Sequence, residues 1–207
     1  MDKNIKTIIF DLGGVILDLS VNHTLDAIGT LSNFDREKVM QIFVSSPEFE
    51  VYEKGGMRDA DFRNFIRKAY AFSASDEEID KGWNAMLRGI PAVKLALLKR
   101  LMRSHQTILL SNTNTIHLNY INNVILPPLA NVNSLDPYFH KTYYSHIMRK
   151  RKPDAEIFEQ VLQENNLVPS QTLFLDDNEL NVKGAQAVGI QTAHVTSPDL
   201  ILAYFNE

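Results

Sequence analysis

The chain has 207 residues, 44% of them hydrophobic and 22% charged, so its length and composition are typical of a folded globular protein. The formal net charge of -4 gives it no general attraction for nucleic acid or an anionic membrane surface. It has no cysteine, which excludes disulfides, thiolate metal sites and a cysteine nucleophile, and its first apolar run, residues 8–19, is too short and too interrupted to span a membrane. We therefore expect a cytoplasmic protein without nucleic-acid or membrane partners.

Short β-prone runs that end in polar residues recur along the chain, at residues 7–11, 107–112, 142–145, 172–177 and 192–195. Apolar residues at helical spacing predict one helix around residues 97–102 and another around 157–162, the second with Pro153 in its first turn. Alternating strands and helices predict an α/β protein with a doubly wound, Rossmann-like parallel sheet. Ligands of such sheets bind beyond the carboxyl ends of the strands.

Residues 20–88 separate the first two β-prone runs and are too many for a single crossover. Apolar residues recur at helical spacing from Phe62 to Tyr70 and again after Ser75 and Glu78, which form a capping-box pair. Gly55-Gly56 interrupts this segment, and residues 89–91 return to the sheet. The sequence therefore predicts an α/β core of residues 1–19 and 89–207 and a helical domain of residues 20–88.

Acidic residues follow two of the predicted strands. Asp11 ends the first run, where a buried carboxylate needs a cation or hydrogen-bond donors, although it could instead cap the following turn. Asp176 and Asp177 end another run, so three carboxylates meet in one crevice if both strands are central. Clustered carboxylates repel one another without a cation, and all-oxygen ligands suit Mg2+. The alternative for residues 176–178 is a helix N-cap, and one of them can cap while another binds metal.

Ser111-Asn112 and Lys152 are the other candidate site residues. A hydroxyl and backbone N–H groups at a strand-to-helix turn suit phosphoryl oxygens, although Ser111-Asn112 could instead cap a helix over residues 116–124. Lys152 ends a run of four cations, which is typical of a solvated face. Its place before Pro153 lets this Lys reach the crevice while the other three cations stay in water.

Other catalytic patterns are absent from the sequence. The six histidines show no metal-binding spacing, and there is no GxSxG, GxxxxGK[ST] or GxGxxG motif. Three arginines, at positions 58, 63 and 67, could meet a substrate or form a solvated helix face.

Four sequence motifs, taken together, resemble those of the haloacid dehalogenase-like hydrolase superfamily. They are FDLGGV, LLSN, Lys-Pro-Asp followed by Ile-Phe, and FLDD with Asn181 and Gly189 downstream, in that order over nearly the whole chain. The helical insertion is similar to the superfamily's cap domain. Residues 50–62, residues 89–91 and LLSNTNTIH most resemble the branch of sugar-phosphate phosphatases of the glucose-1-phosphatase type.

This resemblance implies a Mg2+-dependent phosphatase for a small phosphorylated metabolite, with a sugar phosphate as the expected substrate. Asp11 would be the nucleophile that forms an aspartyl-phosphate, and Lys152 would neutralise its charge and that of the phosphoryl group. Ser111 and Asn112 would bind the phosphoryl oxygens. The implied Mg2+ ligands are Asp11, the backbone carbonyl of Gly13 and Asp177, with Asp176 either ligating or orienting Lys152.

Gly13 departs from the pattern, because most phosphatases of the superfamily carry there a second Asp that protonates the leaving alcohol and then activates water. Loss of a general acid/base costs about 10²- to 10⁴-fold in rate. An anomeric sugar oxygen or an acyl oxygen, as a leaving group that needs less protonation, would suffer less. Asp18 or a cap residue could replace the missing acid.

Three alternatives remain open. A metal-independent dehalogenase of the same superfamily also lacks the second Asp, but the Asp176-Asp177 pair argues against it. A phospho-accepting receiver protein has its acidic pair near the N-terminus and its Lys near the end, unlike this chain. The third alternative is a pseudoenzyme that binds a phosphorylated ligand without turnover.

Overall fold

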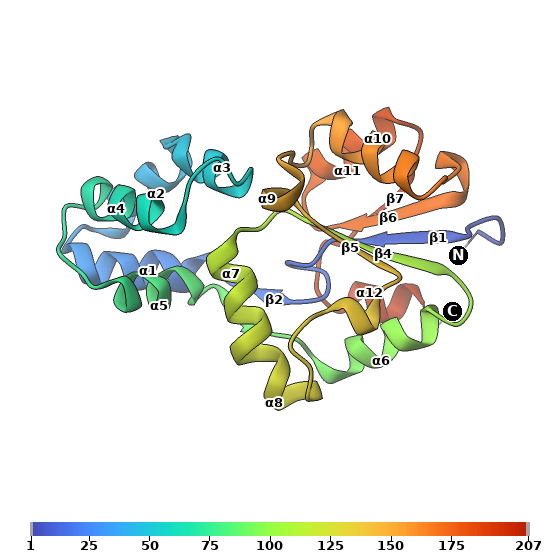
Figure 1. Cartoon of the computed structure of the whole chain (residues 1–207), viewed down its shortest axis with the longest axis horizontal. Coiled ribbons are helices and arrows are strands. Elements are labelled where there is room, and N and C mark those ends of the chain that lie inside the picture. The colour runs from blue at the N-terminus through green and yellow to red at the C-terminus, as the bar shows by residue number, and fades with distance from the viewer. Residues whose placement is uncertain (1, 206–207) are drawn as a thin grey trace.

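The centre of the protein is a five-stranded parallel sheet with strand order β5-β4-β1-β6-β7 (Figure 1). The computed structural model describes residues 2–205. The strands are β1 (Thr7–Phe10), β4 (Gln106–Ser111), β5 (Lys141–Tyr144), β6 (Thr172–Asp176) and β7 (Gln191–His194). They are the five β-prone runs of the sequence, each within one residue of its predicted ends. The predicted doubly wound, Rossmann-like sheet is therefore confirmed.

Helices cover both faces of this sheet, so that alternate residues of β1 are buried on opposite sides. Ile8 and Phe10 belong to the apolar cluster that packs against α6 (Ala92–Leu101) and α12 (Leu200–Tyr204). Ile9 belongs to the opposite cluster, with residues of α10 (Ala155–Glu164) and α11 (Glu179–Ala187) (Figure 1). No helix among residues 2–205 has the length and apolar character needed to cross a lipid bilayer.

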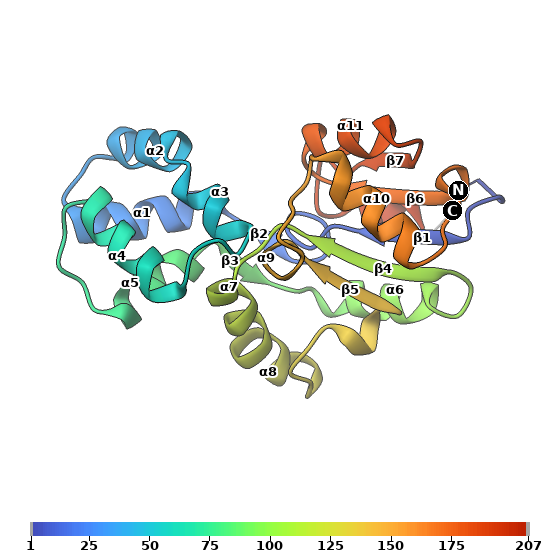
Figure 2. The ribbon, with the colours of Figure 1, turned by 45° about the horizontal axis from the view of Figure 1, so that its top comes forward.

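The insertion folds as five helices. They lie apart from the sheet and form the cap (Figure 2). They are α1 (Val21–Ser32), α2 (Arg36–Ser45), α3 (Glu48–Glu53), α4 (Asp59–Ala69) and α5 (Asp76–Asn84). Aromatic side chains fill their core, where Tyr52 stacks on Phe62 with ring centroids 4.0 Å apart. The predicted capping box of Ser75 and Glu78 is present at the start of α5.

Two short strands join this helical segment to the sheet and have no counterpart in the sequence-based prediction. β2 (Asp18–Leu19) pairs in antiparallel fashion with β3 (Leu87–Gly89). Strands of two and three residues are too short to show a periodic pattern, so only their pairing reveals them. The division of the chain into domains after residues 19 and 88 stays a prediction.

Near the site the structure excludes one alternative, the cap at Ser111-Asn112, and corrects one prediction, the place of Pro153. The helix predicted over residues 116–124 comprises α7 (Thr115–Tyr120), a π-helical turn (Ile121–Ile125) and α8 (Leu126–Ala130), and its N-cap is Asn114, not Ser111-Asn112. Pro153 lies before α10 rather than in its first turn, because the N-cap residue of α10 is Asp154. The remaining short elements are α9 (Ser145–Met148) and 3-10 turns at Asp136–Tyr138 and Pro169–Gln171.

Candidate active site at the carboxyl ends of the strands

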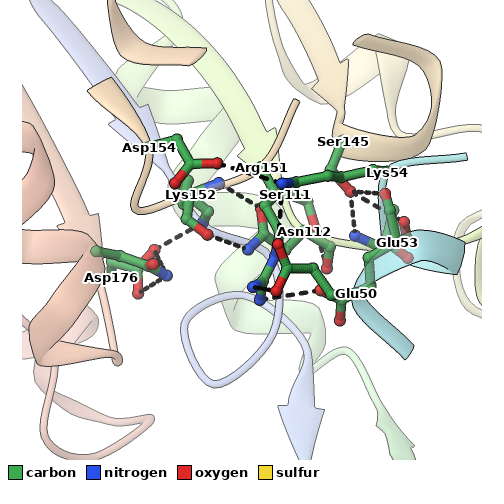
Figure 3. Close-up of polar contacts among 12 residues, drawn as sticks. Glu50, Glu53, Lys54, Ser111, Asn112, Ser145, Arg151, Lys152, Asp154 and Asp176 are labelled. Atoms are coloured by element: carbon green, nitrogen blue, oxygen red, sulfur yellow. Dashed lines mark hydrogen bonds and ion pairs between the residues drawn. The ribbon is translucent and has the colours of Figure 1, made fainter. Parts of the chain in front are cut away.

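Asp11, Lys152 and Asp176 form one buried cluster beyond the ends of β1 and β6. The backbone N–H of Asp11 donates to the carbonyl of Leu175 at 2.8 Å, which continues the strand pairing past β1 and brings Asp11 beside Asp176. Lys152 Nζ donates to Asp11 Oδ1 at 2.6 Å. It also donates to Asp176 Oδ2 at 2.6 Å (Figure 3). The side chains of Lys152 and Asp176 are fully buried, and that of Asp11 is 11% exposed. The structure thus joins three of the residues singled out in the sequence.

Burial and charge act in opposite directions on these groups. Burial raises the pKa of Asp11 to about 7, although Lys152 lowers it, because removal from water disfavours the carboxylate. Burial also disfavours the charged form of Lys152, but Asp11 and Asp176 outweigh it and raise the pKa of Lys152 above its usual value. One lysine between two carboxylates leaves the cluster with a negative charge.

Asp177 adds a third carboxylate, and oxygens of Asp11, Asp176 and Asp177 lie within 4.8 Å of one another. Burial and the neighbouring Asp176 raise the pKa of Asp177. A cation bound among these oxygens would relieve their repulsion, and an all-oxygen set suits Mg2+. Gly14 leaves room for this arrangement, because its φ is +71° and a Cβ there would lie 2.2 Å from Asp177 Oδ2.

Asp176 is already occupied by protein donors. Besides Lys152, it accepts hydrogen bonds from the backbone N–H of Asn178 at 2.8 Å and from Asn181 Nδ2 at 3.0 and 3.1 Å. Asn178 itself caps α11 by accepting from the N–H of Leu180. Of the two roles suggested for Asp176, its contacts therefore favour orienting Lys152 over ligating a metal.

Asn112 holds the backbone of Lys152. Its Nδ2 donates to the Lys152 carbonyl at 2.9 Å, and its Oδ1 accepts from the Lys152 N–H at 3.0 Å. Ser111, buried at the end of β4, lies beside it. The predicted role of these two residues in binding phosphoryl oxygens stays a prediction, and the side chain of Asn112 positions the lysine.

A cleft of about 330 Å³ opens above this cluster, between the sheet and the cap. Gly13, Ser111, Asn112 and Asp177 lie on its core side. Sequence reasoning missed the rest of its lining, which includes the following residues: Phe43, Glu53, Trp83, Met86, His117 and Arg151. Burial lowers the pKa of His117 to about 3, and its ring stacks on Trp83 at 5.0 Å between centroids.

The cap touches the loop that carries Lys152 through a set of ion pairs, which we call the cap latch. Arg151 pairs with Glu50 at 3.4 Å and with Glu53 at 3.1 Å, and Lys54 pairs with Asp154 at 3.5 Å (Figure 3). The prediction that the other three cations of the run stay in water is therefore wrong for Arg151. No local sequence pattern predicts this pairing, because Glu50 and Glu53 are far from residue 151 in the sequence.

The neighbours of Gly13 and Asp18 show why neither position supplies an acid to the cleft. A Cβ at Gly13 would lie 2.4 Å from Leu19 Cδ1, so the leucine side chain occupies the space that a larger residue would need. Asp18 accepts a hydrogen bond from the buried Lys94 at 2.9 Å and is not among the residues that line the cleft. Asp18 therefore lies outside the place where the missing acid is needed.

The three arginines considered as substrate ligands are engaged elsewhere. Arg58 pairs with Asp61, Arg63 with Asp80, and Arg67 with Asp76. All these partners lie within the cap, and none of the three arginines is among the residues that line the cleft. Only Arg58, whose side chain is 84% exposed, fits a solvated helix face; the side chains of Arg63 and Arg67 are partly buried in their ion pairs.

A family model described as haloacid dehalogenase-like hydrolase matches residues 5–189. The chain belongs to this family. The motif order predicted it, and the motifs of this haloacid dehalogenase-like hydrolase lie where the structure places the buried cluster.

The matches to related proteins cover nearly the whole length of this hydrolase. It is 28% identical over 189 residues to a D-ribitol-5-phosphate phosphatase of Bacteroides thetaiotaomicron, covering 91% of this chain and 90% of the relative. It is 24% identical over 200 residues to a sesquiterpene phosphatase of Aspergillus oryzae, covering 95% of this chain and 92% of that protein. A HAD family enzyme from Bacteroides thetaiotaomicron, crystallised with magnesium and inorganic phosphate, superimposes with a TM-score of 0.83 at 35% identity, covering 92% of this chain and 93% of the other.

Proposed function

We propose that this hydrolase is a Mg2+-dependent phosphatase that acts on a small phosphorylated metabolite, with a sugar or sugar-alcohol phosphate as its substrate. The observation that carries the proposal is the position of Lys152, bonded to both Asp11 and Asp176 at 2.6 Å, with Asp177 beside them. A carboxylate, a fixed cation and a further acidic pair are what phosphoryl transfer to an Asp requires.

The residues present fit a magnesium ion. Asp11, the backbone carbonyl of Gly13 and Asp177 would hold it, while Asp176 keeps Lys152 in place through its own hydrogen bonds. Bound there, the ion would supply charge neutralisation that lets the phosphoryl group approach the carboxylates. The relative crystallised with magnesium and phosphate supports this choice of metal.

The chain's own residues would carry out a two-step hydrolysis. The Asp11 carboxylate attacks phosphorus, the bond to the leaving oxygen breaks, and an aspartyl-phosphate forms. Lys152 stabilises negative charge on the phosphoryl group from its fixed position. Ser111, at the carboxyl end of β4, offers a hydroxyl group to the phosphoryl oxygens. Water then hydrolyses the intermediate and regenerates Asp11.

The size of the cleft supports a small substrate. A volume of about 330 Å³ lies at the lower end of the range for small-molecule sites, which is about 300–1,000 Å³. Similarity to the D-ribitol-5-phosphate phosphatase supports a sugar-alcohol phosphate as the substrate of this chain. Similarity to the sesquiterpene phosphatase makes an isoprenoid phosphate the alternative substrate to test.

The test is phosphate release from a panel of sugar, sugar-alcohol and isoprenoid phosphates, with and without Mg2+. We expect Mg2+-dependent turnover that Asp11→Asn abolishes and that Asp18→Asn, outside the cleft, preserves. Acid-quenched wild-type protein should carry covalent phosphate that Asp11→Asn lacks. Metal-independent halide release would favour the dehalogenase, and ligand binding without turnover would favour the pseudoenzyme; either result overturns the proposal.

A further inference from the structure

The proposed reaction needs a proton that the residues around Asp11 do not supply. An alkoxide that leaves phosphorus must be protonated, and the water that attacks the intermediate must lose a proton. Position 13 holds a glycine against Leu19, and Asp18 is bound to Lys94 outside the cleft. Any acid/base must therefore come from elsewhere in the cleft wall.

Four titratable side chains line the cleft within residues 2–205: Glu53, His117, Arg151 and Asp177. Asp177 lies in the proposed metal cluster, and an arginine keeps its proton at any ordinary pH. His117 is buried, its Nδ1 is 2.8 Å from Asn84 Oδ1, and its lowered pKa leaves it without a proton to give near neutral pH. Glu53 is the group that remains.

Glu53 is tied to the phosphoryl-binding end of β4 through one hydroxyl. Its carbonyl accepts a hydrogen bond from Ser145 Oγ at 2.7 Å, and the same Oγ accepts from the N–H of Thr113 at 2.9 Å. Thr113 directly follows Ser111-Asn112. The last residue of α3 is thereby held next to the loop that lies beside the proposed phosphoryl site.

The side chain of Glu53 is held from the other side by Arg151. Arg151 Nη2 lies 3.1 Å from Glu53 Oε2 (Figure 3). The next residue along the chain is Lys152, which contacts Asp11. The cap thus delivers one carboxyl group to the cleft, between two segments that each border the reacting centre.

We propose that Glu53 is the general acid/base of this phosphatase and takes the place of the carboxyl group missing at Gly13. The inference rests on the proposed function. In the first step the leaving oxygen takes the proton of the Glu53 carboxyl group as its bond to phosphorus breaks, giving the free alcohol and a Glu53 carboxylate. In the second step that carboxylate accepts a proton from the attacking water as the Asp11–phosphorus linkage breaks, giving inorganic phosphate and protonated Glu53.

The surroundings of Glu53 suit the proton donation of the first step. Burial raises the pKa of its carboxyl group and Glu50 raises it further, whereas Arg151 and Lys152 lower it. The other charged or titratable groups nearby are Lys54, which is paired with Glu50 and Asp154, and His146 of α9, which packs on α3. A raised pKa keeps the proton on this carboxyl group at a higher pH than on an exposed glutamate, as a general acid requires.

The experiment compares Glu53→Gln with wild type on two substrates, the best sugar-alcohol or sugar phosphate of the panel and an aryl phosphate whose phenolate leaves without protonation. We expect kcat/KM for the first substrate to fall by about 10²- to 10⁴-fold, and that for the aryl phosphate to fall far less. The wild-type decline of kcat/KM at high pH on the first substrate should disappear in Glu53→Gln.

Glu50→Gln is the matched control, because Glu50 also pairs with Arg151 but does not line the cleft. It should leave the ratio between the two substrates unchanged. Equal losses on both substrates in Glu53→Gln, or a rise in KM alone that Glu50→Gln reproduces, would show that Glu53 only fastens the cap and would overturn the inference. No turnover by wild type on any substrate would instead refute the proposed function, and this inference with it.

Discussion

Arg151 and Lys152 are adjacent in the chain but belong to two very different sets of ion pairs. Lys152 and its partners Asp11 and Asp176 are almost entirely buried at the strand ends, whereas in the cap latch the side chain of Arg151 is 27% exposed and that of Glu50 is 50% exposed. Buried pairs are weakly screened, and breaking one leaves an uncompensated charge, while exposed pairs contribute about 0–1 kcal/mol. Breaking the strand-end cluster is therefore expected to cost more free energy than breaking the cap latch, and the cap latch is expected to be more sensitive to salt.

This difference fits a division of labour between core and cap. The groups proposed to attack and stabilise the phosphoryl group lie on rigid strand ends, where a small misplacement would be costly. The proposed proton donor and part of the apolar wall of the cleft, including Phe43, Trp83 and Met86, come from the cap.

The largest expected effect comes from breaking the buried cluster. Lys152→Met should reduce phosphate release by about 10²- to 10³-fold or more, because a fixed charge on the phosphoryl group is lost. It should also lower the free energy of unfolding, measured in urea without Mg2+, by about 3–5 kcal/mol, because Asp11 and Asp176 lose their counterion.

Lys94→Met is the control for this change, since Lys94 is equally buried but pairs with Asp18, whose side chain is 41% exposed. Asp18 can be hydrated after the substitution, so we expect a loss of about 1 kcal/mol and normal activity. Equal destabilisation by the two lysine substitutions would contradict the distinction between buried and exposed partners.

A second test concerns His117 of the core, which contacts Asn84 and Trp83 of the cap through a hydrogen bond and ring stacking. Its pKa falls from 6.5 in the unfolded chain to about 3 in the folded protein because of burial. Above pH 6.5 neither state binds this proton; below it only the unfolded state does, so the free energy of unfolding should fall by about 1.4 kcal/mol per pH unit down to about pH 3.

Urea unfolding at several pH values measures this slope. His117→Gln should have a flatter profile than wild type over that range. A profile of His117→Gln parallel to that of wild type would mean that the imidazole is not held neutral between Trp83 and Asn84.

The smallest effect is expected at the cap latch. Glu50→Gln should change the free energy of unfolding by less than about 1 kcal/mol, since both it and Arg151 are partly hydrated. Raising the salt concentration should alter KM in wild type more than in Glu50→Gln, because screening acts on a charge pair that the variant lacks. A salt response of the same size in both proteins would show that this pair does not control the cap.

The candidate site was predictable where it depends on strand ends. Asp11 and Asp176 each follow a short apolar run, and parallel strands deliver such residues to one edge of the sheet. Ser111 follows the same rule. The alternative that Ser111-Asn112 caps a helix could not be decided from the sequence, because several residues after β4 can cap and only the backbone decides that Asn114 does so.

Glu53 and Arg151 could not have been predicted in this way. Glu53 is one of three glutamates on α3, and Arg151 is one of four consecutive cations, so neither stands out from its neighbours in the sequence. Which glutamate reaches the cleft depends on how α3 packs on α9 and on the hydrogen bond from Ser145.

The strands, the helical insertion and the acidic residues at the strand ends follow from local sequence pattern, because near neighbours in the chain set the periodicity and the ends of apolar runs. The tertiary structure alone decided that Leu19 fills the space beside Gly13, that Lys152 bridges two carboxylates, and that the cap contributes Glu53 to the cleft. These contacts join residues far apart in the chain, and their free energy comes from the packing of whole elements rather than from local pattern.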